Sequence, residues 1–124
     1  MQKYDNVRKN EKIKLLNNIL NVTGVTRVAL INRNGSIINC SASSEIENEN
    51  LWSLITNSFT TSEVIGVELF WGYLNQCLLE YETNKILMAT IGDNILAVIT
   101  EGNAAIGNVR YNMNKAIEAL IKIL

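Results

Sequence analysis

The sequence predicts an α/β domain, of the α+β type, in which one five-stranded antiparallel sheet has helices on both faces. Three segments, at 10–23, 47–71 and 103–124, have apolar residues at helical spacing. Five short apolar segments lie between them and are separated by turn signals. The predicted order is therefore α-β-β-α-β-β-β-α. The length of 124 residues suits a single domain over 1–124, with 1–9 as a candidate flexible or extended N-terminal arm.

A glycine separates the first predicted helix from the strand after it. The helical pattern ends at Thr23, and Gly24 suits the left-handed backbone position that follows many helices. The continuous apolar run from Val28 to Ile31 is typical of a central strand that is covered on both faces. We therefore expect a buried strand over 25–32 and a structural role for Gly24.

A hairpin is predicted after that strand. Asn34 and Gly35 both tolerate a positive φ, which a type I′ turn requires at its two central residues. The pair therefore predicts a type I′ turn that leads into a second strand over 36–41. Gly35 is expected to be structural, because a side chain with a branched Cβ is strained at such a position.

The long helix predicted from Glu47 to Trp71 carries more apolar surface than one face of a sheet needs. Excess apolar surface on a domain marks an interface. Small residues around Ser58 to Ser62 occupy the middle of the helix, where two helices can approach closely. The sequence leaves open whether Trp52 and Trp71 belong to the core or to an interface.

Three strands in quick succession predict an antiparallel meander after the long helix. We expect them over 74–82, 85–91 and 95–100, joined by short polar turns. The first of them places Glu80 and Glu82 on one face. Two such carboxylates can bind a cation, but a solvated or partner-facing strand surface is the interpretation that we favour.

The last helix is predicted to begin at Asn103, a suitable N-cap residue. Gly102 and Gly107 have the spacing of a phosphate-binding loop, but the lysine and the hydroxyl residue that complete this motif are absent. We therefore expect no bound nucleotide, and we assign Gly107 to close packing of the helix against the sheet. Arg110 is either an arginine finger or, as we favour, a structural residue whose stem packs inward and whose head bonds a carboxylate or strand carbonyls.

Composition excludes several classes of function. The chain has no histidine, which removes the usual general base near neutral pH, and Cys40 and Cys77 are too far apart in sequence for a metal-binding motif. The net charge of −1 argues against a nucleic-acid-binding surface. No apolar stretch approaches the ~20 residues of a membrane span, and the polar segment 1–10 is unlike a secretory signal. We expect a cytoplasmic protein with no enzymatic activity, metal or cofactor.

Three segments, taken in order, resemble the roadblock (dynein light chain) domain family. The chain as a whole resembles a stand-alone member of the prokaryotic type. The three segments are Gly24-Val25 leading to Asn32–Gly35, then Ile91–Val98, and finally Asn103–Arg110. The resemblance covers about residues 11–124. It implies a profilin-like three-layer fold and dimers made by edge strands and central helices. It also implies that the chain binds small Ras-like GTPases, as a regulator or as a scaffold.

These implications define the expected sites. The expected function is that of a dimeric binding protein for a small Ras-like GTPase, and a small-molecule-sensing or general assembly module of the same fold is the alternative. The dimer interface is expected at Leu74, Gln76, Leu78, Glu80, Phe59 and Ser62. The partner is expected to bind at Trp52, Ile55, Ser58, Thr61 and Ile65. Structural roles are assigned to Gly24, Gly35, Gly107 and Arg110.

Overall fold

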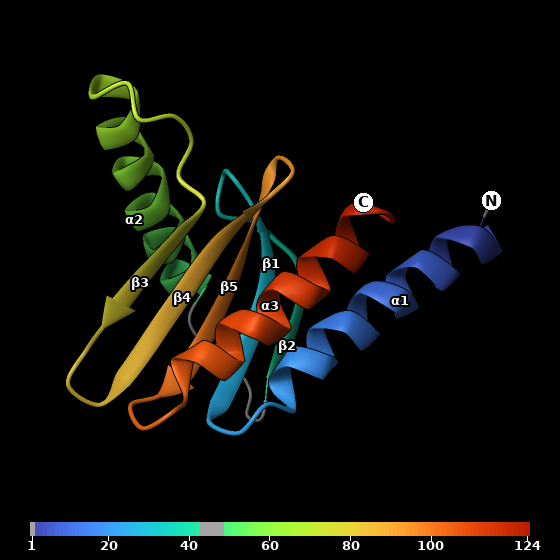
Figure 1. The fold of residues 1–124 in the computed structure, drawn as a ribbon. Helices are drawn as coiled ribbons and strands as arrows, with labels where there is room; N and C mark the ends of the chain where they lie inside the picture. Colours follow the sequence, from blue (N-terminus) through green and yellow to red (C-terminus); the bar gives the residue numbers. More distant parts are fainter. Residues whose placement is uncertain (1, 43–48) are drawn as a thin grey trace.

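The computed structural model describes residues 2–42 and 49–124, and the predicted start of the long helix at Glu47 lies outside these ranges. The elements follow the predicted order α-β-β-α-β-β-β-α (Figure 1). They are α1 (Gln2–Leu20), β1 (Val25–Asn32), β2 (Ile37–Ala42), α2 (Glu49–Glu68), β3 (Gln76–Glu80), β4 (Asn84–Ile91), β5 (Asn94–Glu101) and α3 (Ile106–Ile121).

The five strands form one antiparallel sheet with the order β2-β1-β5-β4-β3. The central pairing joins β1 to β5, where Val28 lies opposite Val98. This pairing links segments far apart in sequence, so β1 has a neighbour on both sides. The edges of the sheet are β2 and β3. The predicted five-stranded antiparallel sheet is confirmed.

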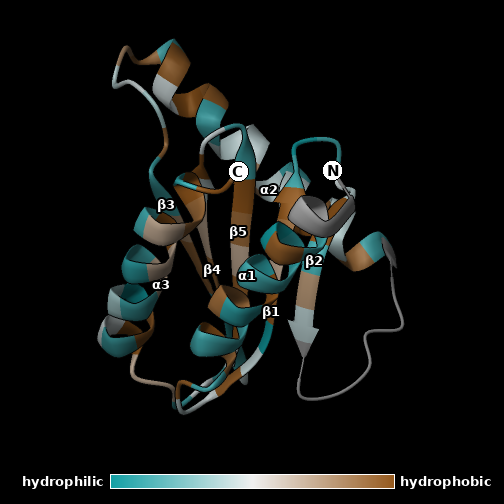
Figure 2. Ribbon diagram, turned by 90° about the vertical axis from the view of Figure 1, so that its right-hand side faces the viewer, coloured by the Kyte–Doolittle hydropathy of each residue, from teal (hydrophilic) through white to brown (hydrophobic). Residues whose placement is uncertain are grey.

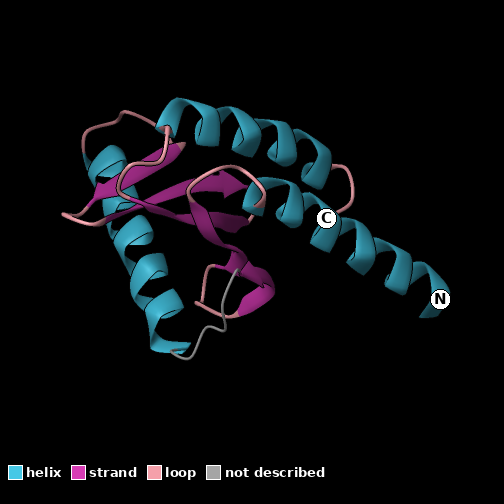
Figure 3. Ribbon diagram, turned by 90° about the horizontal axis from the view of Figure 1, so that it is seen from below, coloured by secondary structure: helices cyan, strands magenta, loops and turns pink. Residues whose placement is uncertain are grey.

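Helices cover both faces of the sheet, which gives the three layers of a profilin-like fold (Figures 1 and 3). The helices α1 and α3 pack on one face, and α2 packs on the other. The apolar run of β1 alternates between the two cores: Val28 and Leu30 face α1 and α3, whereas Ala29 and Ile31 face α2. All four side chains are fully buried, as the continuous apolar run predicts.

The first helix is longer at its start and shorter at its end than we expected. It includes residues 2–9, which we treated as a candidate arm, and it ends at Leu20 rather than at Thr23. After it, Gly24 has a φ of +91°, and a Cβ there would lie 2.7 Å from the Cβ of Ala104. Both observations support the structural role of Gly24.

The turn of the β1–β2 hairpin is not of type I′, because Gly35, at +92°, is its only residue with a positive φ. The N–H of Gly35 donates to the carbonyl of Asn32 (3.0 Å), and the N–H of Asn32 donates to the carbonyl of Ser36 (2.9 Å). These bonds define a three-residue loop in which glycine follows a tight turn. Asn34 has a negative φ, and its side-chain oxygen accepts a hydrogen bond from the N–H of Ser36 (2.9 Å), as in an Asx turn.

The second helix ends at Glu68, before the expected end at Trp71. The chain reverses there: Phe70 has a φ of 58°, and the N–H of Trp71 donates to the carbonyl of Gly66 (2.8 Å). The strand β3 is correspondingly shorter than the predicted 74–82. Its approach is fixed by Thr90, whose hydroxyl donates to the carbonyl of Leu74 (2.8 Å).

The last helix shows two further differences. Its N-cap is Ala105, without a side-chain capping bond, so Asn103 is not the cap. Gly107 is exposed, and a Cβ there would meet nothing within 4 Å, so its assignment to close helix–sheet packing is wrong. Of the two glycines near the start of α3, Gly102 is the one in a tight contact, because a Cβ there would lie 2.9 Å from the carbonyl oxygen of Thr83.

Candidate protein-interaction site

The inner side of α2 belongs to the core. Trp52 and Phe59 are fully buried and Ile55 is 3% exposed, packed over Ala29, Ile31 and their neighbours in the sheet. We expected Trp52 and Ile55 to bind a partner and Phe59 to contact a second subunit. These three expectations are wrong, because the side chains lie one helical turn apart on the face that the sheet covers.

The outer side of α2 is apolar and uncovered. Leu54, Val64 and Ile65 are 66%, 54% and 55% exposed. Thr61 is exposed between them, and Ser58 is half-buried. Figure 2 shows that the end of α2 projects beyond the body of the domain and carries strongly hydrophobic segments. Of the predicted partner-binding residues, Ser58, Thr61 and Ile65 therefore lie at or beside the surface.

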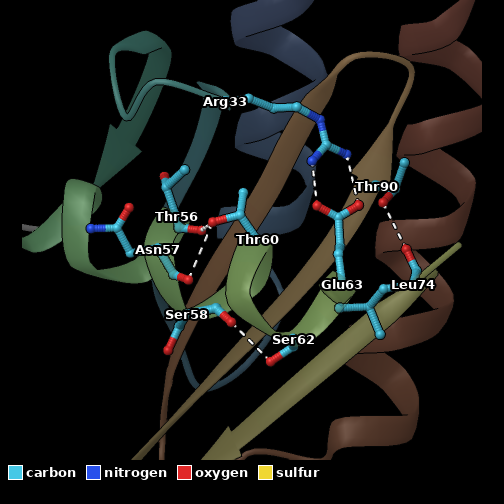
Figure 4. A network of polar contacts seen from close by, with 9 residues as sticks. All are labelled: Arg33, Thr56, Asn57, Ser58, Thr60, Ser62, Glu63, Leu74 and Thr90. Carbon is cyan, nitrogen blue, oxygen red and sulfur yellow. Dashed lines mark hydrogen bonds and ion pairs between the residues drawn. The ribbon is translucent and has the colours of Figure 1, made fainter. Parts of the chain in front are cut away.

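Three hydroxyl groups in the middle of α2, those of Thr56, Thr60 and Ser62, donate to carbonyls within the helix, and Figure 4 shows the bonds of Thr60 and Ser62. The hydroxyl of Ser62 donates to the carbonyl of Ser58 (2.8 Å), and the hydroxyl of Thr56 donates to the carbonyl of Trp52 (2.8 Å). These three hydroxyls are paired with carbonyls of the preceding turn. Each of them can therefore be covered by a protein surface without losing its hydrogen bond.

An ion pair fastens the β1–β2 hairpin to α2 (Figure 4). The guanidinium of Arg33 binds the carboxylate of Glu63 through both nitrogens, with Nη2 3.1 Å from Oε2. This hydrogen bond to Glu63 raises the pKa of Arg33 above its ordinary value. Beside the pair, a cleft of about 570 Å³ opens between α2 and the ends of the strands. Its lining consists of Arg33, Glu63, Tyr73, Asn75, Thr90, Gly92 and Asp93.

The edge strand β3 carries three of the predicted dimer residues, Gln76, Leu78 and Glu80, and a fourth, Leu74, lies two residues before it. Leu78 is 39% exposed, and Glu80 is exposed with an ion pair to Lys85 (3.6 Å). The side chain of Gln76 is held by α3: it accepts from Nε of Arg110 (2.9 Å) and donates to Oδ1 of Asn114 (2.9 Å). Arg110 is thus half-buried and bonds an amide, not the carboxylate or strand carbonyl that we expected.

Among the side chains that the structure describes, the most exposed aromatic ones lie in the segment between α2 and β3. Phe70 is 96% exposed, Tyr73 is 93% exposed and Trp71 is 75% exposed. Trp71 and Tyr73 border an apolar hollow of about 260 Å³ against the end of α2. We did not predict this site, because the apolar residues 69–71 continue the helical pattern. Gly72, with a φ of +91°, lies in the turn, but the predicted helix continued up to this glycine.

The described residues contain little else that supports chemistry. Within them, no three His, Cys, Asp or Glu side chains gather closely enough to hold a metal ion. Cys40 and Cys77 are free thiols, and burial raises the pKa of Cys40. None of the helices in the described ranges combines the length and the apolarity that a membrane span requires.

Comparisons with known proteins agree with this geometry. The Roadblock/LC7 domain model matches residues 12–101. The uncharacterized protein MJ1340 of Methanocaldococcus jannaschii is 26% identical over 97 residues, which cover 78% of this chain and 85% of that protein.

Among solved structures, MglB of Myxococcus xanthus has a TM-score of 0.83 at 20% identity, covering 91% of this chain and 94% of that chain. An MglB with a tetrameric arrangement has a TM-score of 0.85 at 18% identity, covering 94% and 89%. Profilin II of Acanthamoeba castellanii has a TM-score of 0.58 at 15% identity, covering 83% and 92%. These structures show the fold, and the match to the domain model shows that the chain belongs to the Roadblock/LC7 domain family.

Proposed function

We propose that this chain is a dimeric, non-catalytic binding protein that regulates or scaffolds a small Ras-like GTPase. The observation that carries the proposal is the uncovered apolar face of α2, which lies beside an open sheet edge. Leu54 and Ile65 are each more than half exposed on this helix. A contiguous apolar surface of this kind is typical of protein–protein interfaces. The resemblance to roadblock proteins supplies the class of partner.

The dimer is proposed to use the edge strand β3. An unpaired edge exposes backbone donors and acceptors to any other strand, and a second copy can pair with it about a twofold axis. The predicted interface residues Leu74, Gln76, Leu78 and Glu80 lie on or beside this strand. Ser62 lies on the part of α2 that borders Leu74. The tetrameric MglB shows that a protein of this fold can assemble.

The GTPase is proposed to dock on the outward face of the α2 pair. Thr61 is exposed in the middle of this face, with Asn57 and Val64 beside it. Ser58 and Ile65 lie on its border toward β3. Affinity at such a surface comes mostly from a few large apolar side chains, while small residues between them allow close approach.

The test is capture of purified small GTPases by the immobilised chain, each loaded with GDP and with a non-hydrolysable GTP analogue. We expect at least one GTPase of the source cell to bind with a preference for one nucleotide state. Thr61→Arg is expected to abolish capture. Arg replacement of Glu118, which is exposed on the opposite helix α3, is the matched control and should bind normally. Absence of capture in both nucleotide states would refute the proposal.

A small-molecule sensor remains the alternative, and the cleft beside Arg33 and Glu63 favours it. Its volume of about 570 Å³ is large enough for a metabolite, and its lining includes both charges. Thermal-shift screening with small polar metabolites tests this function. A ligand that raises the melting temperature of the native protein, but not of Arg33→Ala, would support the sensor over the GTPase-binding protein.

A further inference from the structure

The cleft beside the Arg33–Glu63 ion pair contains opposite charges that come from two different turns. Arg33 lies in the loop of the β1–β2 hairpin, and Asp93 lies in the turn between β4 and β5. Both line the cleft, whose volume is about 570 Å³. The pKa of Arg33 is raised mainly by its hydrogen bond to Glu63, and the charge of Asp93 contributes. Asp93 therefore lies within electrostatic reach of Arg33.

Both charged groups have hydrogen-bonding capacity left for a ligand. Asp93 is exposed, and it has no ion-pair partner among the residues that the structure describes. The terminal nitrogens of Arg33 each donate to one oxygen of Glu63, but a guanidinium has more N–H donors than these two bonds use. Arg33 is also the more accessible member of the pair, because 37% of its side chain is exposed against 19% for Glu63. The cleft thus offers donors from Arg33 and acceptors from Asp93.

The rest of the lining is neutral and includes an aromatic ring. Tyr73 is 93% exposed and borders both this cleft and the apolar hollow at the end of α2. The neutral polar residues Asn75 and Thr90 also line the cleft. Thr90 joins β4 to the segment before β3, because its hydroxyl donates to the carbonyl of Leu74 (2.8 Å; Figure 4) and its N–H donates to the carbonyl of Asn75 (3.1 Å). An apolar group of a ligand can therefore lie against the ring of Tyr73 without meeting a further charge.

We propose that this cleft binds a free α-amino acid with an apolar side chain. The carboxylate of the amino acid accepts hydrogen bonds from Arg33, its ammonium group donates to Asp93, and its side chain packs on the ring of Tyr73. The volume of the cleft is typical of sites for small molecules. The inference rests on the small-molecule sensor given above as the alternative function, and it names the class of ligand. It does not depend on binding of a GTPase.

The two charges together select against ligands of a single sign. An amine that binds Asp93 also meets the like charge of Arg33, and a carboxylate that binds Arg33 meets the like charges of Asp93 and Glu63. A zwitterion pairs with both groups at once. Because its two charged groups are attached to one carbon atom, both contacts form in a single binding geometry. Burial of the exposed ring of Tyr73 favours a ligand that is also apolar.

The test is isothermal titration calorimetry of the native protein with L-phenylalanine, phenethylamine and hydrocinnamate. All three ligands carry the same phenyl group, but phenethylamine lacks the carboxylate and hydrocinnamate lacks the ammonium group. We expect L-phenylalanine to bind more tightly than either analogue by roughly tenfold or more, because each analogue loses one charge-assisted hydrogen bond. Glycine, which has no apolar side chain, is also expected to bind more weakly than L-phenylalanine.

Two variants test the charged groups separately. Asp93→Asn and Arg33→Met are each expected to weaken the binding of L-phenylalanine roughly tenfold or more. Asp93→Asn should not weaken the binding of hydrocinnamate, because it removes a like charge and leaves Arg33 in place. Glu82→Gln is the matched control: it removes one exposed carboxylate from the turn between β3 and β4, at the other end of the sheet, and should bind L-phenylalanine normally. Circular dichroism checks that every variant folds.

The outcomes separate this proposal from the proposed functions. Absence of binding of L-phenylalanine at millimolar concentration would overturn it. Equal affinity for phenethylamine, or unchanged affinity of Asp93→Asn for L-phenylalanine, would also overturn it, because the ammonium or the carboxylate would then have no role. A sensor would still stand if another polar metabolite raised the melting temperature. Capture of GTPases is measured on the native protein without ligand, so none of these results bears on it.

Discussion

Gly35 offers a stringent test of how closely the hairpin approaches α2. A methyl group added by Gly35→Ala would lie 2.8 Å from Oγ of Ser53 and 3.2 Å from its Cα. The residue also has a φ of +92°, which side chains other than that of glycine rarely adopt. The substitution therefore combines backbone strain with a steric clash.

Two other glycines separate these effects. Gly92 has a φ of +58° but open space around it, so Gly92→Ala should cost only the backbone term, about 1 kcal/mol. Gly107 has neither constraint and lies in a helix, so Gly107→Ala should stabilise the protein by up to about 1 kcal/mol. At Gly35 the clash with Ser53 comes in addition to a φ of +92°, which is less favourable for alanine than the +58° of Gly92. We therefore expect Gly35→Ala to lower the free energy of unfolding by about 2–4 kcal/mol.

Urea unfolding followed by circular dichroism, at one fixed protein concentration, measures these differences. Ser53→Ala removes the nearest atom, so it should recover part of the loss when combined with Gly35→Ala. If Gly35→Ala is no more destabilising than Gly92→Ala, the hairpin does not pack against α2 as described. If Gly107→Ala destabilises the protein, then Gly107 does pack closely against a neighbouring element.

Three further predictions concern α2 and its contacts. Phe59→Ala should destabilise the fold by about 3–5 kcal/mol, because it leaves a cavity at a fully buried position. Ile65→Ala, at a position that is 55% exposed, should cost less than about 1 kcal/mol. Thermal unfolding of both variants measures the difference. Arg33→Met should cost no more than about 1 kcal/mol, because the ion pair with Glu63 is partly exposed and screened by salt. Because the pKa of Arg33 is raised in the folded protein, the stability that the ion pair contributes is fully present below the ordinary pKa of arginine and is lost only as the pH rises through the raised pKa. The stabilities of the native protein and of Arg33→Met should therefore run parallel between about pH 6 and pH 9. Thr61→Arg should leave the sedimentation of the dimer unchanged while capture of the GTPase is lost; loss of both would place Thr61 in the dimer seam.

The order of elements was predictable because it depends on local pattern. The apolar run from Val28 to Ile31 and the turn signals of the meander each describe neighbouring residues. The role of a glycine depends instead on what packs against it. Gly102 meets Thr83, and Gly24 meets Ala104, across distances in sequence that no local pattern records. Gly107 has the same local appearance and meets nothing.

The end of α2 was mispredicted for a related reason. Apolar residues at helical spacing continue to Trp71, so the pattern favours a helix up to Gly72. The structure ends the helix earlier because the chain folds back on Gly66, where a Cβ would lie 2.7 Å from the carbonyl oxygen of Gly72. The missing side chain of Gly66 leaves room for this contact, and Gly72 has a φ of +91°, which favours glycine. Trp71 is consequently displaced from the helix into the exposed segment that follows.

The apolar residues of α2 are divided between the core and the exposed surface, and the sequence did not separate the two sets. The same helical spacing serves a core and a seam, so periodicity alone cannot separate Trp52 from Leu54. What separates them is the position of the helix over the sheet. Its buried row covers Ala29, Ile31 and Ala97 in the central strands, while Cys77 and Leu79 on the edge strand are only partly covered. A single copy of α2 therefore leaves the β3 side of its face open, and the side chains that overhang this side are the ones available to a second subunit or to a partner.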